Sequence, residues 1–358
     1  MWIGLTGFSR ILTIQKGEIN DLKKLLIASL ILCLFSVNTF AYGERGHRLV
    51  GAIADRRVAK NQALANKVRQ LLGGMTLQRV STLPDEIKGW QCGDNPPPGS
   101  NRVMRELRAF VNANCNSPSH NQFHFTNIPV FGDEQYDDGE VGRNEFDIVH
   151  MIPFCLRVLK GEEPETNNRK ITKAVAVILL THYFGDIHQP LHVGAEFFDG
   201  DGTPFGPTTS NKGFGDQGGN KLILLTFMSG RRTAAGKLHG YWDTQTVENA
   251  FGQTQDATVA QRLAGREPPD WQLTGEVETW AEQLANDIMP LAREARQRLE
   301  YKRIRIEQGN RDIISGNAEE KKKLPGGTFY AIWAGDVVKK EIHKGGWRLA
   351  ALLEEVLQ

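Results

Sequence analysis

Two short segments of this chain carry histidine and aspartate at a spacing suited to holding a metal ion. THYFGDIHQPLH contains His182 and Asp186, KLHGYWD contains His239 and Asp243, and His192 follows directly after Pro-Leu. Residues four apart lie on one face of a helix about one turn apart, so each pair can converge on one point. Neutral imidazoles and carboxylates suit a borderline cation such as zinc, with no thiolate required. One such pair is also common on ordinary surfaces, but two pairs in aromatic-flanked segments indicate a metal centre.

Three further residues are candidate ligands, each with a plain structural alternative. His47 stands at the start of a predicted helix, just after YGERG. Asp85, in TLPDEIKGW, follows a proline at a predicted helix start, where an acid is also favoured by the helix dipole alone. His124 lies between two phenylalanines in QFHFTNIP and could equally be a core histidine with satisfied hydrogen bonds.

The other histidines are weaker candidates. His188 is two residues after Asp186 and so points elsewhere on a helix, which favours a supporting or packing role. His120, His150 and His343 lack an obvious partner in the sequence and are interpreted as structural or exposed.

The N-terminal region is typical of a secretory signal peptide. An apolar run over 25–36 follows two lysines, and Thr39 and Ala41 occupy the −3 and −1 positions of a cleavage site. The run is short for a bilayer span, although an uncleaved anchor is the alternative. We expect cleavage after Ala41, a mature chain over 42–358, and a secreted or periplasmic protein without stable membrane association. Residues 1–22 lack the signal pattern and are interpreted as an extension upstream of the true start.

The net charge and the cysteines restrict the classes of binding partner and the redox compartment that the chain would suit. The formal net charge is only +1, so no broad field attracts polyanions, and nucleic-acid binding would have to come from a local groove and from metal charge. Cys92 and Cys115 flank a polar stretch and could pair in an oxidising compartment. Cys155 lies in an apolar run and is expected to be a small buried hydrophobe.

Hydrophobic periodicity predicts a mainly α-helical protein with a few short strands, and nothing in the chain marks a linker between domains. A strand is expected over 220–228, and two Gly/Pro/Asn-rich stretches, 91–122 and 195–219, are predicted as surface loops. The expected helices cover 47–58, 60–72, 170–188, 275–300 and 346–357.

The motifs resemble those of one known family. YGERGHRLVGAIA, LPDEI, HFTNIP, THYFGDIHQPLHVG, GGNKLIL and KLHGYWD occur in the order found in the zinc-dependent single-strand nucleases and 3′-nucleotidases, the family of mung bean nuclease. Zinc-dependent bacterial phospholipases C are structural relatives of that family. The resemblance runs from Tyr42 to the final GGWRLAALLEEVL. It implies a single compact helical domain of the phospholipase C and single-strand nuclease type over 42–358, with three zinc ions at the bottom of a cleft.

The resemblance also distributes the ligands among three ions. The first ion would take Asp85, His124, His182 and Asp186. The second would take His192, His239 and Asp243. The third would take His47, Asp186 as a bridge, and the α-amino nitrogen and carbonyl oxygen of Tyr42. An ordinary α-amino group has a pKa near ~8, so a metal can displace its proton, but only processing creates this ligand.

Three residues depart from the family pattern, and two more complete the implied site. Tyr42 replaces the usual Trp, Lys88 replaces Arg, and Asn127 replaces an Asp proposed to orient the attacking water. Lys88 keeps the charge without the bidentate fork, and Asn127 cannot act as a base. Lys88 and Asn220 would hold phosphate oxygens, while Phe125 would either stack on a nucleobase or pack in the core.

The resemblance implies a secreted, monomeric phosphodiesterase that cleaves single-stranded DNA, RNA and 3′-nucleotides to 5′-phosphate products. Ions bridged by Asp186 would hold a water and lower its pKa towards neutrality. A phospholipase C using the same ions is the alternative; it would favour an exposed apolar rim, whereas 91–122 and 195–219 are polar. A non-catalytic zinc-binding protein is a poorer fit, because an open, water-holding cluster suits storage badly.

Overall fold

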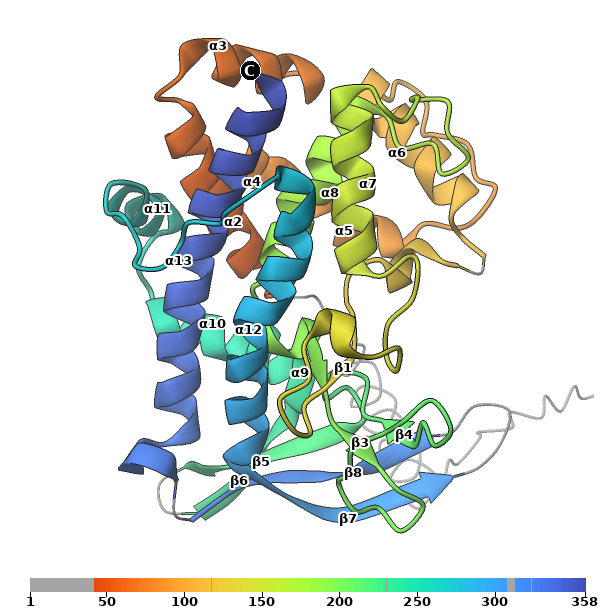
Figure 1. The fold of residues 1–358 in the computed structure, drawn as a ribbon. Coiled ribbons are helices and arrows are strands. Elements are labelled where there is room, and N and C mark those ends of the chain that lie inside the picture. Colours follow the sequence, from red (N-terminus) through yellow and green to blue (C-terminus); the bar gives the residue numbers. More distant parts are fainter. Residues whose placement is uncertain (1–41, 117, 229–230, 308–312, 323) are drawn as a thin grey trace, which may run out of the picture. The chain divides into compact units, whose positions relative to one another are not determined.

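The computed structural model describes residues 42–358 except 117, 229–230, 308–312 and 323 (Figure 1). The predicted signal peptide lies outside the described residues. The longer helices are α2 (Gly43–Val58), α3 (Gln62–Leu71), α6 (Arg102–Ala113), α7 (Ile148–Lys160), α8 (Lys173–Asp186), α10 (Thr246–Phe251), α11 (Asp256–Ala264), α12 (Trp280–Gln297) and α13 (Tyr330–Leu357). Short helices are α4 (Leu77–Val80), α5 (Leu83–Glu86) and α9 (Leu238–Gly240). The predicted mainly α-helical class is therefore confirmed.

Helix α8 is the central helix, and its sequence explains why. Every residue from Ala174 to Asp186 is buried. The helix begins where the Thr172 hydroxyl accepts a hydrogen bond from the Val175 amide at 3.3 Å, which satisfies one of the free amides of the first turn. Helices α2, α6, α7 and α13 all contact it. A helix that is apolar all round can be stable only when it is surrounded in this way.

Helix α2 is held close to its neighbours by glycines. A Cβ atom on Gly346 of α13 would lie 2.5 Å from the Cβ of Ile53, and one on Gly51 would lie 2.6 Å from the Leu77 carbonyl oxygen of α4. No side chain fits at either contact without movement of its neighbour. The N-terminal turn of α2 is thereby placed next to the C-terminal end of α8.

A four-stranded sheet lies at one end of α12 and α13 in Figure 1. Its strands are β5 (Leu222–Met228), β6 (Arg231–Lys237), β7 (Leu299–Glu307) and β8 (Ile313–Glu320), in the order β6-β5-β8-β7. Strands β5 and β8 are parallel, and the other two pairings are antiparallel. Two smaller sheets pair β1 (Ile128–Pro129) with β2 (Gly194–Ala195), and β3 (Phe197–Phe198) with β4 (Phe214–Gly215).

Several predicted boundaries need correction. Strand β5 confirms the strand expected at 220–228, but β6, β7 and β8 were not predicted. The helix expected at 275–300 ends at Gln297, because the chain turns into β7 at Leu299. The helix expected at 346–357 is the second half of α13, which begins at Tyr330.

The prediction of a continuous surface loop over 91–122 is wrong, because α6 lies within it. Asn101 caps that helix by accepting the Met104 amide at 2.9 Å, and Val103, Leu107 and Phe110 bury its apolar face. The Gly, Pro and Asn residues of this stretch lie before and after the helix, and they do not indicate a loop throughout. Within the other predicted loop, 195–219, Phe197 and Phe198 are buried in the β3–β4 pair and are not surface residues.

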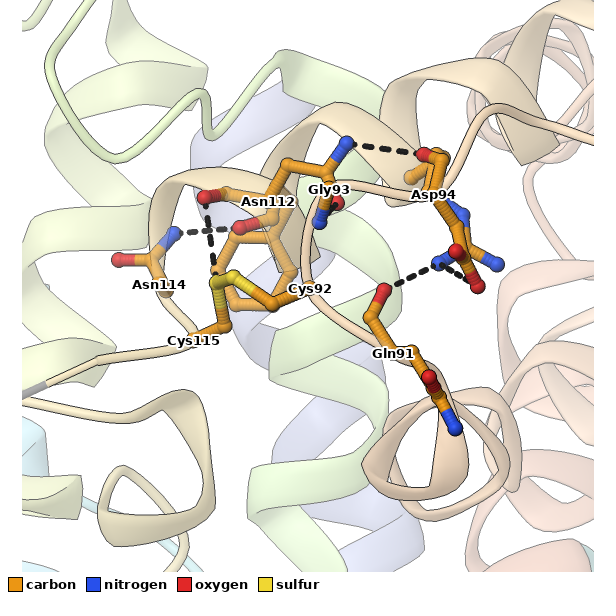
Figure 2. Close-up of a disulfide and its surroundings, with 9 residues drawn as sticks. Gln91, Cys92, Gly93, Asp94, Asn112, Asn114 and Cys115 are labelled. Carbon is orange, nitrogen blue, oxygen red and sulfur yellow. Dashed lines mark hydrogen bonds and ion pairs between the residues drawn. A yellow bond between two sulfur atoms is a disulfide. The ribbon is translucent and has the colours of Figure 1, made fainter.

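A disulfide between Cys92 and Cys115 ties the C-terminal end of α6 to the preceding segment, with a Cα–Cα distance of 5.8 Å (Figure 2). The Gly93 amide donates to Asn112 Oδ1 at 3.0 Å, which adds a second link between the same two segments. Cys155 is a buried free cysteine, as predicted. Among the described residues, no helix has both the length and the apolar character needed to cross a membrane.

Candidate metal centre

The last turn of α8 carries the two residues at the middle of the centre. His182 Nε2 lies 3.2 Å from Asp186 Oδ2, as the spacing of four on one helix face predicts. Both side chains are fully buried. His182 Nδ1 lies 2.6 Å from the Ser81 carbonyl oxygen and must donate to it, because a carbonyl only accepts. Nε2 is therefore the nitrogen free to act as a ligand.

The β1–β2 pair brings two more imidazoles beside this turn. The Thr126 amide donates to the His192 carbonyl at 2.9 Å, so the segment carrying His124 runs next to the segment carrying His192. His124 Nδ1 lies 2.9 Å from Asp186 Oδ2 and 3.0 Å from His182 Nε2. These three residues form one group whose ligand atoms lie within 4.8 Å of one another.

His47 reaches the other oxygen of the same carboxylate from α2. Its Nε2 lies 3.3 Å from Asp186 Oδ1, and its ring stacks on the His182 ring with centroids 3.8 Å apart. A Cβ atom on Gly185 would lie 2.4 Å from His47 Nδ1, so glycine is the residue that leaves room for this imidazole. Asp186 thus lies between two sets of histidines, one on each oxygen.

Asp85 approaches from the short helix α5. Its Oδ1 lies 3.6 Å from His182 Nε2, and it groups with His47 and His182 within 4.8 Å. Lys88, one turn later, places Nζ 2.6 Å from the same Oδ1. The Lys88 side chain is 25% exposed, whereas that of Asp85 is 3% exposed, so the ammonium lies between the carboxylate and solvent.

A third group joins His192 to the segment after β6. His192, His239 and Asp243 lie within 4.8 Å, with His239 Nε2 3.1 Å from His192 Nε2 and 3.5 Å from Asp243 Oδ2. Asp243 belongs to a π-helical turn over Tyr241–Gln245, a widened turn that is often found at functional sites. Gln189 Nε2 donates to Asp243 Oδ1 at 2.8 Å and fixes that carboxylate.

Backbone carbonyls orient the imidazoles of this third group. His192 Nδ1 donates to the His124 carbonyl at 2.9 Å, and His239 Nδ1 donates to the Gly218 carbonyl at 2.8 Å. Together with the His182–Ser81 bond, three rings are held with Nε2 directed at the centre. Such outer contacts set the tautomer and raise the ability of the ligand nitrogen to donate electrons.

Burial and mutual charge set the protonation of the ligands. Burial, helped by Lys88, lowers the pKa of His124 to about 3, and burial with His192 lowers that of His239 to about 3. Burial alone would raise the pKa of Asp85, but His182 and Lys88 outweigh it and lower the pKa to about 2. A neutral His124 and His239 beside an ionised Asp85 are the protonation states that a cation requires. Burial would lower the pKa of His182, but Asp186 and Asp85 outweigh it and raise that pKa.

Asp186 and Asp243 differ in the direction of their shifts. Burial would raise the pKa of Asp186, but His182 and His192 hold it well below the ordinary value. Burial raises the pKa of Asp243 well above the ordinary value, with Gln189 opposing. A bound cation would be the largest local charge and would favour the ionised form of Asp243.

The orphaned polar atoms of the centre fit a metal. Among the described residues, none makes a well-aligned hydrogen bond to the buried atoms His47 Nδ1 and Nε2, Asp186 Oδ1 and Asp243 Oδ2, although His47 Nε2 and Asp186 Oδ1 lie 3.3 Å apart. Leaving buried polar atoms unpaired is costly, and native structures generally avoid it. Imidazole nitrogens and carboxylate oxygens from this set fit zinc in donor type and in number.

Tyr42 lies at the edge of the centre and is completely buried. Its hydroxyl donates to the His188 carbonyl at 2.6 Å, and its carbonyl accepts the Gly46 amide at 3.0 Å. Tyr42 and Gly43 both have left-handed backbone conformations, with φ of 40° and 48°. A Cβ atom added to Gly43 would lie 2.9 Å from the Asp243 carbonyl oxygen. The chain therefore enters α2 in contact with the π-helical turn.

The predicted substrate residues are more exposed than the candidate ligands. Phe125 is half-buried and outside the hydrophobic core cluster, and Asn127 and Asn220 are also half-buried. The Asn127 amide donates to the Gly142 carbonyl at 2.9 Å, and Asn220 Nδ2 donates to the Gln217 carbonyl at 3.1 Å.

The remaining histidines have structural roles. His188 donates from Nδ1 to the Phe184 carbonyl at 2.7 Å, and Arg348 donates to its Nε2 at 3.1 Å, which matches the predicted supporting role. His150 and His343, interpreted from the sequence as structural or exposed, both have partners in the structure. His150 contacts Asp147 at 3.1 Å, and His343 lies 2.7 Å from the Leu263 carbonyl oxygen.

Sequence reasoning missed the residues that orient the ligands. Gln189 stands inside the HQPLH motif and could have been weighed as a supporting residue, because amides commonly fix ligating carboxylates. The carbonyls of Ser81 and Gly218 carry no signal in the sequence, because any residue type supplies a backbone oxygen.

Known proteins with similar sequences agree on one family. The profile of the S1/P1 nucleases matches residues 42–358. Endonuclease 4 of Arabidopsis thaliana is 22% identical over 352 residues, which cover 94% of this chain and 96% of that protein. Endonuclease 3 of the same plant is 24% identical over 345 residues, covering 94% and 96%. Endonuclease 2 is 23% identical over 232 residues, and there the match spans 63% of each chain, under two thirds of that relative's length.

Proposed function

This chain belongs to the S1/P1 nuclease family, and from that premise we propose that it is a zinc-dependent phosphodiesterase acting on single-stranded DNA and RNA and on 3′-nucleotides, with 5′-phosphate products. The observation that carries the proposal is the convergence of three buried His and Asp groups on neighbouring points. The similar plant proteins are named endonucleases, which supports the same class of substrate.

We assign three zinc ions to the residues of these groups, divided as the family resemblance implies. Asp85, His124, His182 and Asp186 would hold the first, and His192, His239 and Asp243 the second. His47, Asp186 and the backbone nitrogen and oxygen of Tyr42 would hold the third. When bound, the ions would supply Lewis acidity, which activates water and offsets charge on the phosphate.

The side chains around the ions would bind and orient the substrate. Lys88, whose ammonium lies 2.6 Å from Asp85 Oδ1 and whose side chain is 25% exposed, would pair with a phosphate oxygen as a point charge. Asn220 would donate from its amide to a second oxygen. Asn127 carries an amide, which cannot accept a proton at neutral pH, so it would orient groups by hydrogen bonding alone.

Phe125 would stack on a nucleobase next to the phosphate. Its partial exposure and its position outside the hydrophobic core cluster support this role over core packing. Stacking on an aromatic ring tolerates any base and requires that the base leave its own stack. The ligands themselves are almost fully buried, so a phosphate must enter to reach them. Unpaired strands can do so, whereas a stacked duplex cannot present its phosphate in this way.

Export is consistent with the rest of the proposal. The Cys92–Cys115 disulfide supports an oxidising compartment, as expected after secretion or transfer to the periplasm. Cleavage after Ala41 would leave residues 42–358 as a single monomeric domain and would free the Tyr42 amine for the third ion.

The test combines metal analysis with four parallel substrates: denatured DNA, RNA, 3′-AMP and phosphatidylcholine vesicles. We expect three zinc ions per chain, hydrolysis of the first three substrates, and much slower cutting of duplex DNA. EDTA should abolish activity and zinc should restore it, whereas magnesium should not, given the imidazole-rich ligand set. Cleavage of phosphatidylcholine without action on denatured DNA would overturn the proposal in favour of a phospholipase C.

A further inference from the structure

The turn over Asp216–Asn220 stands directly behind one of the metal-centre histidines. Its Gly218 carbonyl accepts the His239 Nδ1 hydrogen at 2.8 Å. Gly218 has a φ of 62°, and an added Cβ would lie 2.2 Å from the Leu191 carbonyl oxygen, so the turn packs tightly against the residue before His192. The direction of the Gly218 carbonyl therefore decides how the His239 ring is held.

Asp216 anchors this turn through its backbone and its side chain. Its carbonyl accepts the amides of Gly219 and Lys221, both at 3.2 Å. Its own amide donates to the Glu196 carbonyl at 2.9 Å, and its Oδ1 accepts the Glu196 amide at 3.2 Å. Asp216 is fully buried, so these bonds are shielded from competing water.

A buried arginine from α12 holds the Asp216 carboxylate. Arg296 Nη1 lies 2.6 Å from Oδ2, and Nη2 donates to Oδ1 at 3.3 Å. Arg296 is 3% exposed, so both charges lie in the interior. An ion pair this deeply buried is weak evidence for added stability, because desolvation offsets its attraction, but removal of one partner is strongly unfavourable. Neither residue belongs to the assigned metal ligands or substrate contacts.

We infer that the Asp216–Arg296 ion pair is a positioning pair for the ion assigned to His192, His239 and Asp243. This inference rests on the proposed zinc centre. The pair fixes the turn, the turn fixes the Gly218 carbonyl, and that carbonyl holds His239 with Nδ1 protonated and Nε2 directed at the ion. A loosened turn would release the ring, and metal affinity would fall at this one position.

The first experiment measures zinc occupancy of the processed protein in a series of zinc buffers. Asp216→Asn keeps the shape of the side chain and removes its charge. We expect one of the three ions to bind about 10- to 100-fold more weakly, the range typical of lost outer contacts, with the other two unchanged. Arg296→Lys keeps the positive charge but loses the two-pronged contact of the guanidinium with the carboxylate. It should weaken the affinity for the same ion by a smaller factor.

Arg298, the residue directly after α12, provides a control with Glu294 of the same helix, whose side chain is 35% exposed. Arg298 is also buried, and its Nη2 lies 2.7 Å from Glu294 Oε1, but its contacts lead to the Thr328 carbonyl and not to a metal ligand. Glu294→Gln should leave all three zinc affinities unchanged. Equal weakening of all three ions in Asp216→Asn, or the same effect in Glu294→Gln, would overturn the inference.

A second measurement needs no metal. Nitrogen-15 NMR of the metal-free protein reports which ring nitrogen of His239 carries the proton. We expect Nδ1 to be protonated in the parent protein and the two tautomers to mix in Asp216→Asn and Arg296→Lys. An unchanged tautomer in both variants would contradict the positioning role. A parent protein that binds no zinc would refute the proposed function, while the NMR result would still decide the role of the pair.

Discussion

Individual residues of the candidate centre fall into proposed metal ligands and residues that orient those ligands. His182, His192 and His239 each use Nδ1 on a backbone carbonyl, which leaves Nε2 as the inward nitrogen. Asp186 differs, because its two oxygens face different histidines: Oδ1 lies 3.3 Å from His47 and Oδ2 2.9 Å from His124. One carboxylate therefore connects two parts of the centre.

Removal of the Asp186 carboxylate should be the most damaging single change. Asp186→Ala would leave two cations facing each other with less compensating charge, so we expect loss of up to two ions and a fall in kcat of about 10³-fold or more. Asp243→Ala, assigned to one ion, is the matched comparison and should lose one. Zinc analysis measures the number of ions lost, and assays on denatured DNA measure the fall in kcat. Near-normal zinc content in Asp186→Ala would show that the bridging assignment is wrong.

Glu196 should make stability depend on pH. Burial raises the pKa of Glu196 from the ordinary 4.5 to about 7, although Arg296 opposes the shift. Between these two values the folded protein keeps the proton that the unfolded chain releases, so stability should fall as pH rises from about 4.5 to about 7 and level off above. The full effect is on the order of 3 kcal/mol. Glu196→Gln removes it.

Urea unfolding of the parent protein and Glu196→Gln at several pH values tests this expectation. The contributions of other titrating groups cancel in the difference between the unfolding free energies of the two proteins. This difference should change between pH of about 4.5 and about 7 and stay constant above neutral pH. Parallel curves would mean that Arg296 keeps the Glu196 carboxylate ionised throughout.

At the scale of elements, the end of α8 is shaped around the centre. Gly185 lies in the final turn of a helix, where alanine is ordinarily more favourable by up to about 1 kcal/mol. Here an added Cβ would lie 2.4 Å from His47 Nδ1, so a methyl group would displace a ligand. At this position the space that the His47 ring needs outweighs the higher helix propensity of alanine.

Gly185→Ala should therefore weaken zinc binding despite its better helix propensity. We expect the ion assigned to His47 to be lost first, measured by zinc titration. Gly335→Ala in α13 is the control: the nearest atom to its added Cβ is 3.8 Å away, so it should stabilise the protein by roughly 0.5–1 kcal/mol without touching the centre. Gly185→Ala with full zinc affinity would contradict this account of the glycine.

The disulfide should contribute stability without contributing chemistry. The bond joins residues separated by 23 positions, so its removal by paired Cys92→Ser and Cys115→Ser changes should lower the free energy of unfolding by about 3 kcal/mol. Zinc content at low temperature should be unchanged, because α6 carries no assigned ligand. A variant that lost zinc while still folded would show that α6 supports the centre directly.

Periodicity predicted elements well where one face or all faces were apolar, and poorly elsewhere. Helices α2, α3 and α8 begin and end within a few residues of expectation. Helix α6 was missed because Gly, Pro and Asn around it resembled a loop. Strands β6 and β7 were missed because RRTAAGK and LEYKRIRIE carry many charges and form the edges of a sheet, where only the partner strands reveal the pairing.

At the scale of the whole molecule, the ligands come from distant parts of the chain. The i,i+4 pairs His182–Asp186 and His239–Asp243 could be read from the residues alone. His47, Asp85 and His124 needed the resemblance, because a lone acid or histidine has a structural explanation that is equally good. The Asp216–Arg296 ion pair could not be predicted, since α12 and the turn meet only in the folded protein.

The start of the described chain packs beside the candidate centre. Tyr42 is completely buried, and its hydroxyl donates to the His188 carbonyl at 2.6 Å. Gly43 follows with a left-handed φ of 48° and lies against the Asp243 backbone. These contacts hold the first residue of the predicted mature chain beside two ligand segments, so a free amine there could serve as a ligand that no other residue replaces.

We therefore expect mass spectrometry of the exported protein to show Tyr42 as its first residue. A version made without the signal and starting with one additional residue before Tyr42 has an amide in place of that amine, and an amide nitrogen binds zinc poorly. It should fold, since the Tyr42 side-chain contacts remain, but it should hold two ions in place of three and lose activity on denatured DNA. Proteolytic removal of the extra residue should restore both. An active, three-zinc enzyme that keeps the extra residue would exclude the α-amine of Tyr42 as a ligand and would overturn the proposed backbone chelate.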